Sequence, residues 1–202
     1  MVNFQDSVTK VNLARAFAGE CQEGARYQFL AKMALQEKYS YLSNFIRTLA
    51  HNEMSHAEQF FNKLNEYGAD SVQNIEIHAG YPYQKSDLYT TLLLESKNEK
   101  STGENVYPAF AKIARDEGYK DIAELFLKVA EVEKQHKRVL ELLSDALKTK
   151  KLYKSNDAAW FKCDECGFVV KGKTAPKICP LCQAEQGYFR IDFSNFEELG
   201  KQ

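Results

Sequence analysis

Two short motifs in this chain combine a carboxylate with an imidazole at the same spacing. Both read Glu-x-x-His, the first at Glu53 and His56 and the second at Glu133 and His136. Residues three apart share one face of a helix, so each motif would present both groups in one direction. Oxygen and nitrogen ligands offered together suit a redox-active divalent metal such as iron or manganese. A single such motif is usually ordinary surface chemistry, so the prediction depends on finding both together.

Four of the five cysteines form a second candidate metal site near the end of the chain. Cys163 and Cys166 make one Cys-x-x-Cys pair, and Cys179 and Cys182 make another after twelve intervening residues. In a reducing compartment such pairs indicate metal ligands rather than disulfides. Four thiolates at this spacing can hold one tetrahedral metal ion, and both zinc and iron accept that geometry. The remaining cysteine, Cys21, is interpreted as a buried inert thiol.

The first pair of motifs requires long helices to position it. Apolar residues recur at helical spacing over residues 7–37, 40–67, 86–118 and 119–149, which predicts four helices. Residues 68–86 lose the pattern and are interpreted as a linker of 19 residues. Such a linker reaches roughly 60 Å when extended, whereas a 28-residue helix is about 42 Å long. Two short connections and one long crossover predict a ferritin-like four-helix bundle.

Two details of the third predicted helix concern its backbone. Ser86 is a good N-cap residue for its start, and Gly118 is a good end signal. Pro108 lies inside the helix and lacks a backbone N–H, so we expect a kink or local irregularity near it.

Acidic residues occupy positions on these helices where a hydrophobic core is expected. Those on the predicted core faces, together with two histidines, are Glu20, Glu53, His56, Glu99, Glu133 and His136. An unpaired buried carboxylate costs several kcal/mol, so four of them need compensating cations. One Glu from each of two helices and Glu-x-x-His from each of the other two form the ligand set of a carboxylate-bridged two-metal site. Glu95, one turn before Glu99, is interpreted as an edge-facing or hydrogen-bonded residue and as the candidate for an extra ligand.

The chain resembles the rubrerythrin family over nearly its whole length. The resemblance rests on five pieces of sequence, which are Phe17-Ala-Gly-Glu20 with Tyr27, Glu53-x-x-His56, Tyr107-Pro108 through Glu117-Gly118, Glu133-x-x-His136, and the two cysteine pairs. It implies a mainly α-helical ferritin-like di-iron domain over residues 1–149, a linker over 150–158, and a small rubredoxin-like β domain over 159–202. It also implies two iron ions in the bundle and one iron on the four cysteines, with zinc as the alternative there.

The resemblance further implies an oxidoreductase, a non-haem peroxidase that reduces hydrogen peroxide to water in defence against oxidative stress. Electrons would come from a reductase or a rubredoxin, pass through the four-cysteine iron and reach the di-iron site. A head-to-tail homodimer would bring one subunit's cysteine site near the di-iron site of the other.

The expected ligand roles follow from the same resemblance. Glu53 and Glu133 are expected to bridge the two irons. One iron would then be completed by Glu20 and His56, and the other by Glu99 and His136. Tyr27 and Tyr107 are expected to donate hydrogen bonds to ligand carboxylates.

One position departs from the family's pattern. The family's third helix carries two ligand glutamates three residues apart, and the matching positions here hold Glu99 and Thr102. Threonine does not replace a carboxylate, so the choice between peroxide and oxygen as oxidant stays open. An oxygen-reducing ferroxidase is therefore an alternative function, and a non-catalytic zinc-ribbon interaction protein is a third.

Composition excludes several other classes of protein. Charged residues make up 27% of the chain and its net charge is −1, so no nucleic-acid partner is expected. No apolar run is long enough to span a membrane, and the N-terminal residues lack the apolar segment of a signal peptide. We therefore expect a cytoplasmic protein.

Overall fold

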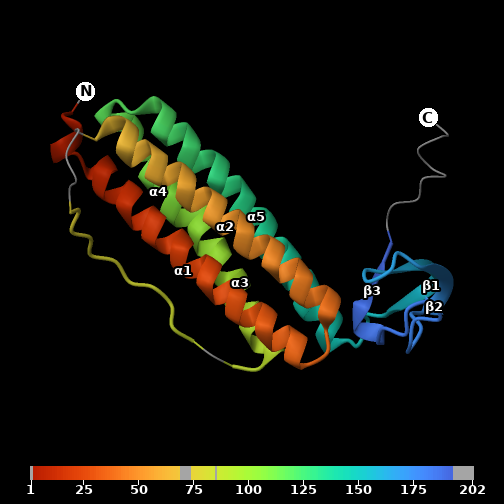
Figure 1. Cartoon of the computed structure of the whole chain (residues 1–202). Coiled ribbons are helices and arrows are strands. Elements are labelled where there is room, and N and C mark those ends of the chain that lie inside the picture. Colours follow the sequence, from red (N-terminus) through yellow and green to blue (C-terminus); the bar gives the residue numbers. More distant parts are fainter. Residues whose placement is uncertain (1, 69–73, 85, 193–202) are drawn as a thin grey trace, which may run out of the picture.

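Five α-helices and a three-stranded sheet make up the computed structural model, which describes residues 2–68, 74–84 and 86–192 (Figure 1). The helices are α1 (Val8–Gln36), α2 (Ser40–Tyr67), α3 (Leu88–Ser101), α4 (Tyr107–Glu117) and α5 (Lys120–Lys148). The strands are β1 (Lys154–Cys163), β2 (Val169–Thr174) and β3 (Phe189–Ile191). Because α3 and α4 continue one another, the helices form a four-helix bundle with a small β unit after it, as predicted.

The long third helix is interrupted between α3 and α4. Residues Thr102–Val106 form a π-helical turn, and Pro108 lies in the first turn of α4. A helical turn with an extra residue accommodates a proline that cannot donate to the preceding turn. The irregularity expected near Pro108 is therefore confirmed, and it takes the form of a π turn.

Gly103 allows this π turn to approach α5 closely. A Cβ at position 103 would lie 2.8 Å from the carbonyl oxygen of Ala130 and 3.2 Å from Cβ of Glu133. Any side chain larger than hydrogen would therefore push the π turn away from the part of α5 that carries Glu133.

The start of α3 and the end of α4 follow capping rules, with one correction to the sequence analysis. Asp87, and not the predicted Ser86, is the N-cap of α3, because its carboxylate accepts a hydrogen bond from the N–H of Thr90 at 3.0 Å. Gly118 ends α4 in the left-handed conformation, with φ at 98°, as predicted.

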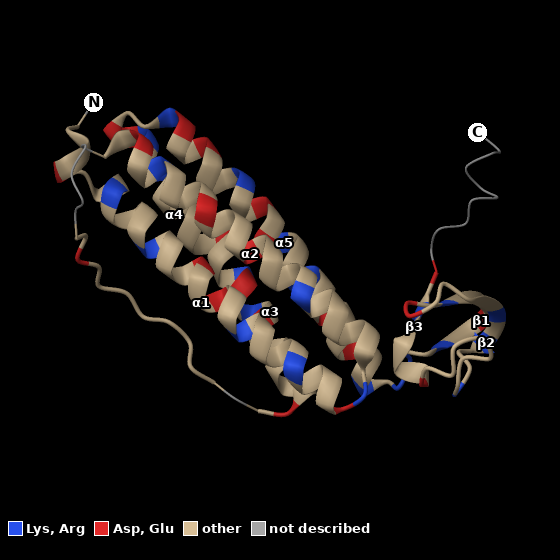
Figure 2. Ribbon diagram, viewed as in Figure 1, with Lys and Arg blue, Asp and Glu red and all other residues tan. Residues whose placement is uncertain are grey.

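Residues 74–84 of the crossover run alongside α1 (Figure 1). Tyr81 fixes this segment to the helix, because its hydroxyl donates to the backbone oxygen of Arg15 at 3.0 Å. Figure 2 shows acidic and basic side chains interspersed along the bundle in this view, without a broad surface of one sign. Across the described residues, no helix combines the length and apolar character needed to span a lipid bilayer.

Two apolar clusters fill the bundle on either side of its polar middle. One contains Phe60, Phe126 and Tyr107, and the other contains Tyr27 and Leu92. Apolar side chains thus cover the middle of the bundle on two sides, while the side chain of His56 stays 13% exposed.

The β unit is an antiparallel sheet in the order β2-β1-β3, with Phe161 of β1 opposite Val170 and Ile191. It contacts the α1–α2 turn, where Lys38 pairs with Glu185 at 2.9 Å. The sheet starts at Lys154, inside the segment 150–158 predicted as a linker. Residues 193–202 of the predicted domain lie outside the described residues.

Candidate metal centre

The predicted carboxylates and histidines of the bundle meet at its centre. In the described part of the chain they form two groups of potential metal ligands whose donor atoms lie within 4.8 Å of one another. Glu20 and His56 complete one group, Glu99 and His136 complete the other, and both groups share two carboxylates. The shared carboxylates are Glu53 and Glu133. This is the arrangement expected for two neighbouring metal ions held together by bridging carboxylates.

Apart from a hydrogen bond between Nδ1 of His56 and Oε2 of Glu53 at 3.1 Å, most of the donor atoms approach one another without hydrogen-bond alignment. Nδ1 of His136 lies 2.9 Å from Oε1 of Glu53 and 3.1 Å from Oε2 of Glu133, yet it has no aligned hydrogen-bond partner. The same is true of both carboxylate oxygens of Glu133 and of buried oxygens of Glu20, Glu53 and Glu99. Buried polar atoms are normally paired. Their convergence on common points, rather than on each other, fits metal coordination.

The ionisation of these groups shows how strongly the site needs positive charge. Burial lowers the pKa of His136, but contacts with Glu133, Glu53 and Glu99 raise it to about 12. His56 behaves in the same way, with a pKa raised to about 12. Burial raises the pKa of Glu20, the contact with His56 lowers it, and the charges of Glu133 and Glu53 raise it, so that it lies at about 8. Without metal, the histidines therefore hold the protons that balance the carboxylates.

Two buried tyrosines orient the terminal carboxylates from opposite ends of the site. The hydroxyl of Tyr27 on α1 donates to Oε1 of Glu99, and that of Tyr107 on α4 donates to Oε1 of Glu20. Each tyrosine thus reaches across the bundle to the helix that faces its own. The geometry places both as partners of the candidate ligand carboxylates, as expected.

Asn52 is a neighbour of the site that the sequence analysis did not identify. Its side-chain amide lies 3.3 Å from Nε2 of His136. The side-chain oxygen and nitrogen of an asparagine are interchangeable in such an assignment. A contact at Nε2 leaves Nδ1 facing the carboxylates, which is how an outer partner fixes the orientation of a ligand histidine.

The residue Glu95 lies outside both groups of candidate ligands. It is 4% exposed and accepts from Nε of Arg26 at 3.2 Å and from Nδ2 of Asn98 at 3.1 Å. The structure therefore supports its interpretation as a hydrogen-bonded residue. Cys21 is half-buried, not fully buried as predicted.

Glu23 is a second buried carboxylate beside the site, and the sequence analysis missed it. It is 7% exposed, and its Oε1 lies 3.0 Å from Nη2 of Arg26. After burial, the charge of Glu23 does most to raise the pKa of Glu99. The spacing Glu20-x-x-Glu23 repeats that of the two Glu-x-x-His motifs and is the signal that would have revealed it.

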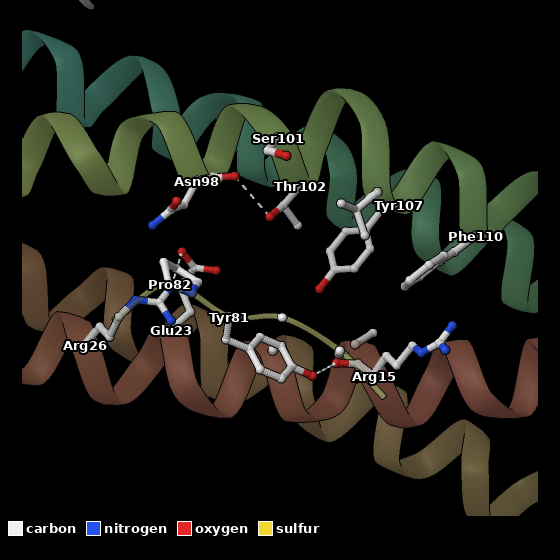
Figure 3. Close-up of a pocket in the computed structure, with 15 residues that line it drawn as sticks. Arg15, Glu23, Arg26, Tyr81, Pro82, Asn98, Ser101, Thr102, Tyr107 and Phe110 are labelled. Atoms are coloured by element: carbon white, nitrogen blue, oxygen red, sulfur yellow. Dashed lines mark hydrogen bonds and ion pairs between the residues drawn. The ribbon is translucent and has the colours of Figure 1, made fainter. Parts of the chain in front are cut away.

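A cavity of about 230 Å³ lies beside Glu23 (Figure 3). Arg15 and Tyr81 line one side, while Thr102 and Tyr107 line the other. The cavity therefore reaches the tyrosine whose hydroxyl donates to Glu20.

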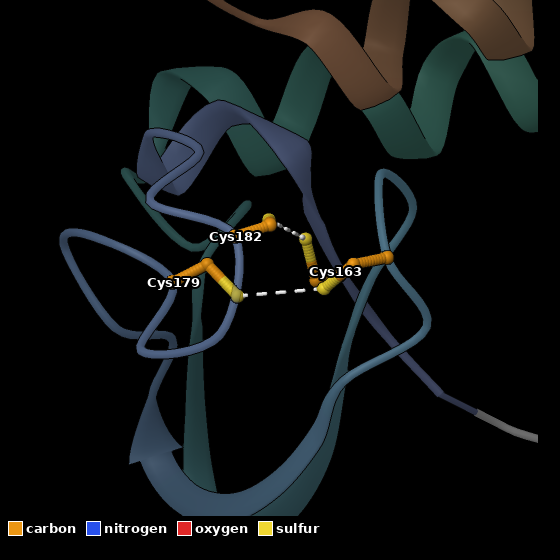
Figure 4. A group of neighbouring side chains, drawn as sticks. Cys163, Cys179 and Cys182 are labelled. Carbon is orange, nitrogen blue, oxygen red and sulfur yellow. Dashed lines mark hydrogen bonds between the residues drawn. The ribbon is translucent and has the colours of Figure 1, made fainter.

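The four cysteines form the second site, in two equivalent turns, and Figure 4 labels Cys163, Cys179 and Cys182 of this group. In each turn the residue after the second cysteine donates its N–H to the carbonyl of the first, Gly167 to Cys163 at 2.8 Å and Gln183 to Cys179 at 3.0 Å. Both of these residues have positive φ, 78° for Gly167 and 63° for Gln183. The two turns are therefore matched in backbone conformation as well as in sequence spacing.

The sulfur atoms have the spacing of a tetrahedral metal site. Sγ of Cys163 lies 3.8 Å from that of Cys182, and Sγ of Cys166 lies 3.6 Å from that of Cys179. A metal–sulfur bond of about 2.3 Å gives a tetrahedral edge of about 3.8 Å. Burial raises the pKa of Cys179, but the backbone N–H groups of Cys182 and Leu181 lower it to about 7. This favours the thiolate at Cys179. At Cys166 the backbone N–H of Phe168 lowers the pKa, but burial and the three neighbouring thiols raise it to about 12.

Comparison with known proteins agrees with both sites. The rubrerythrin family model matches residues 11–144 and 92–162, and the model of the rubrerythrin rubredoxin-like domain matches residues 161–190. The chain is 38% identical to rubrerythrin-1 of Clostridium acetobutylicum over 197 residues, covering 97% of this chain and 100% of that protein. It is 32% identical to rubrerythrin of Nitratidesulfovibrio vulgaris over 193 residues, covering 95% and 97%.

Solved structures show the same fold. The fully reduced, all-ferrous state of nigerythrin matches with a TM-score of 0.60 and 22% identity, covering 95% of this chain and 94% of that one. A Desulfovibrio desulfuricans bacterioferritin with a di-iron site matches with a TM-score of 0.62 and 23% identity, covering 71% and 81%. With a di-iron carboxylate site in a ferritin-like bundle and a four-cysteine rubredoxin-like site, the chain belongs to the rubrerythrin family.

Proposed function

We propose that this chain is a non-haem di-iron peroxidase that reduces hydrogen peroxide to water with electrons delivered through its four-cysteine iron. The observation that carries the proposal is the pair of ligand groups sharing Glu53 and Glu133 at the centre of the bundle. A one-electron site on the same chain supports a redox role for the two-metal site. Hydrogen peroxide takes up two electrons and two protons and yields two molecules of water.

The ligand roles proposed here follow the two groups. Glu53 and Glu133 would be shared between the two metals, because each belongs to both groups. Glu20 and His56 bind one metal, and the other is bound by Glu99 and His136. Held there, two ferrous ions would supply one electron each to the substrate.

The chain's own residues then have three tasks. Tyr27 and Tyr107 hold the terminal carboxylates in place through their hydroxyl groups. The apolar clusters on either side exclude bulk water from the centre. The cavity beside Thr102 admits a molecule as small as hydrogen peroxide.

The placement of the β unit supports electron delivery between subunits. The unit follows the end of α5 (Figure 1). His136 lies twelve residues before that end at Lys148, which is about 18 Å of helix. A head-to-tail homodimer would place the partner's cysteine site nearer to the di-iron centre, with a reductase or rubredoxin as the electron donor.

Oxygen reduction with ferroxidase activity is the second candidate function, and Thr102 favours it. The Thr102 hydroxyl donates to the backbone oxygen of Asn98 at 3.1 Å, so it is directed into its own helix and not toward the metal groups. Position 102 thus offers the metals neither the carboxylate that the family has there nor a hydroxyl in its place. A non-catalytic zinc-ribbon protein, the third alternative, does not explain the buried donor atoms of the bundle.

Rapid mixing of the fully reduced, iron-loaded protein with each oxidant tests the proposal. Reoxidation that is much faster with hydrogen peroxide than with oxygen supports the peroxidase. The reverse order supports the ferroxidase. Glu133→Ala is the control, because loss of a shared carboxylate should abolish fast reoxidation by either oxidant while the helical content is kept.

A further inference from the structure

Glu23 is a buried carboxylate that neither the fold nor the ligand set described above requires. It is 7% exposed, and its Oε1 has no aligned hydrogen-bond partner although Nη2 of Arg26 lies 3.0 Å away. Buried carboxylates are costly unless they are paired and hydrogen-bonded or bind a cation. The role that we assign to Glu23 rests on the di-iron function proposed above.

The two halves of the bundle place Glu23 and Thr102 in equivalent positions. Glu20 on α1 and Glu99 on α3 each accept a hydrogen bond from a tyrosine of the other half. Tyr27 follows Glu20 by seven residues, and Tyr107 follows Glu99 by eight. The extra residue is the one that the π turn accommodates. Three residues after each carboxylate, one half has Glu23 and the other has Thr102.

The space between these two positions is open. Glu23 and Thr102 line the same cavity, and the carboxylate of Glu23 points from α1 toward α3 (Figure 3). The hydroxyl of Thr102 is turned into its own helix, where it donates to Asn98. A carboxylate extending from α1 therefore meets no competing side-chain ligand from position 102.

Arg26 holds Glu23 more loosely than it holds Glu95. Nε of Arg26 donates to both carboxylate oxygens of Glu95, at 3.2 and 3.3 Å, and Asn98 donates to Glu95 as well. Glu23 has the single contact with Nη2, without hydrogen-bond alignment. If Glu23 moves, Arg26 keeps Glu95 as its partner, so the movement does not leave the guanidinium unpaired.

We propose that Glu23 is a further metal ligand, held beside the site by Arg26, which moves onto the metal bound by Glu99 and His136 when the two metals are oxidised. Four carboxylates balance the four positive charges of two ferrous ions. Oxidation of both to ferric adds two positive charges, which attract a nearby buried anion in a medium of low dielectric constant. The extra carboxylate would thus come from α1, in place of the one that the family places on its third helix.

Mössbauer spectra of the full chain loaded with ⁵⁷Fe test this assignment. Glu23→Gln keeps the shape of the side chain and removes the charged ligand. In this variant we expect the signal of one bundle iron to change in the oxidised protein, while the reduced spectrum stays as in the unmodified chain. Glu95→Gln is the matched control, since it replaces the other buried carboxylate beside Arg26 with an amide whose oxygen still accepts from Nε, and it should change neither spectrum.

Suppose that Glu23→Gln and the unmodified chain each bind two irons in the bundle and still give identical oxidised spectra. That result would overturn the assignment of Glu23 as a ligand and leave the proposed function intact. Failure of the unmodified chain to bind two irons in the bundle would instead overturn the proposed function. Crystal structures of the unmodified chain in both redox states give an answer even if the variant does not fold. We expect Glu23 on Arg26 when the site is reduced and on the metal when it is oxidised. A Glu23 that stays on Arg26 in both states contradicts the proposal.

Discussion

Replacing Gly103 with alanine tests how closely the π turn must approach α5. The new Cβ would lie 2.8 Å from the carbonyl oxygen of Ala130, a distance that real Cβ atoms essentially never show. That oxygen belongs to the backbone of α5, so it moves only with the helix. Overpacking of this kind costs about 1–3 kcal/mol, and the upper end applies when the neighbour cannot rotate away. Alanine gains at most about 1 kcal/mol over glycine in a helix.

The expected net destabilisation of Gly103→Ala is therefore about 2 kcal/mol. For a chain of this size each kcal/mol lowers Tm by roughly 2–4 °C, so metal-free protein should melt roughly 4–8 °C lower. The assay is thermal unfolding followed by far-ultraviolet circular dichroism. Iron binding by the bundle should weaken as well, because the same contact positions Glu133.

Gly19→Ala is the matched control within the bundle. A Cβ at position 19 would lie 3.5 Å from a ring carbon of Tyr81, which is an ordinary contact. This variant should be neutral or more stable, by up to about 1 kcal/mol. A Tm for Gly103→Ala equal to or above that of the unmodified chain would refute the reasoning.

Three further predictions concern the two metal sites. Tyr107→Phe removes the hydroxyl that donates to Glu20. An iron titration should show binding in the bundle weakened by roughly 10–100-fold. Unchanged binding would contradict the role given to the hydroxyl. Cys179→Ser should lose the metal of the β unit, and protease should then cleave that unit, because a unit this small depends on its metal to fold. The helical circular dichroism signal should be kept. A β unit that resists protease in this variant would argue against the prediction. In the metal-free protein, burial lowers but carboxylate contacts raise the pKa of His56 and His136 to about 12, and burial raises that of Glu20 to about 8. Each of these groups holds its proton more tightly in the folded state, so stability present at pH 6 should fall as the pH rises above about 6.5. The metal-free Tm should therefore drop between pH 6.5 and 9, whereas that of iron-loaded protein should drop less; a rising metal-free Tm would contradict the sign.

Helical periodicity alone is sufficient to predict that the candidate ligands of the bundle converge. Glu53 and Glu133 fall on core faces with a histidine three residues later. In a helix, side chains three residues apart lie on the same face, so each carboxylate and its histidine point into the core together. Spacing is also enough for the cysteines, since each pair lies within one tight turn. Both sites are accessible from the sequence because each helix or turn fixes the direction of its own ligands, and the predicted fold then brings these ligands together.

Features that depend on contacts between elements are not accessible in this way. Glu23 lies one turn beyond Glu20, and its burial is decided by Arg26 and by the cavity facing α3. The orientation of the Thr102 hydroxyl depends on the π turn. In the sequence, Pro108 predicts only that the helix is irregular nearby and does not predict the kind of irregularity. Asn52 becomes a partner of the site only through the packing of α2 against α5.

The metal content of the purified, iron-reconstituted chain tests the central claim most directly. The structure predicts three irons per chain, two in the bundle and one on the cysteines, measured by elemental analysis against protein concentration. The double variant Glu53→Ala/Glu133→Ala should retain about one, because it lacks both shared carboxylates and keeps all four thiolates. Folded, unmodified chain that binds a single metal ion, held by the cysteines, would contradict the claim that the buried carboxylates of the bundle form a two-metal site.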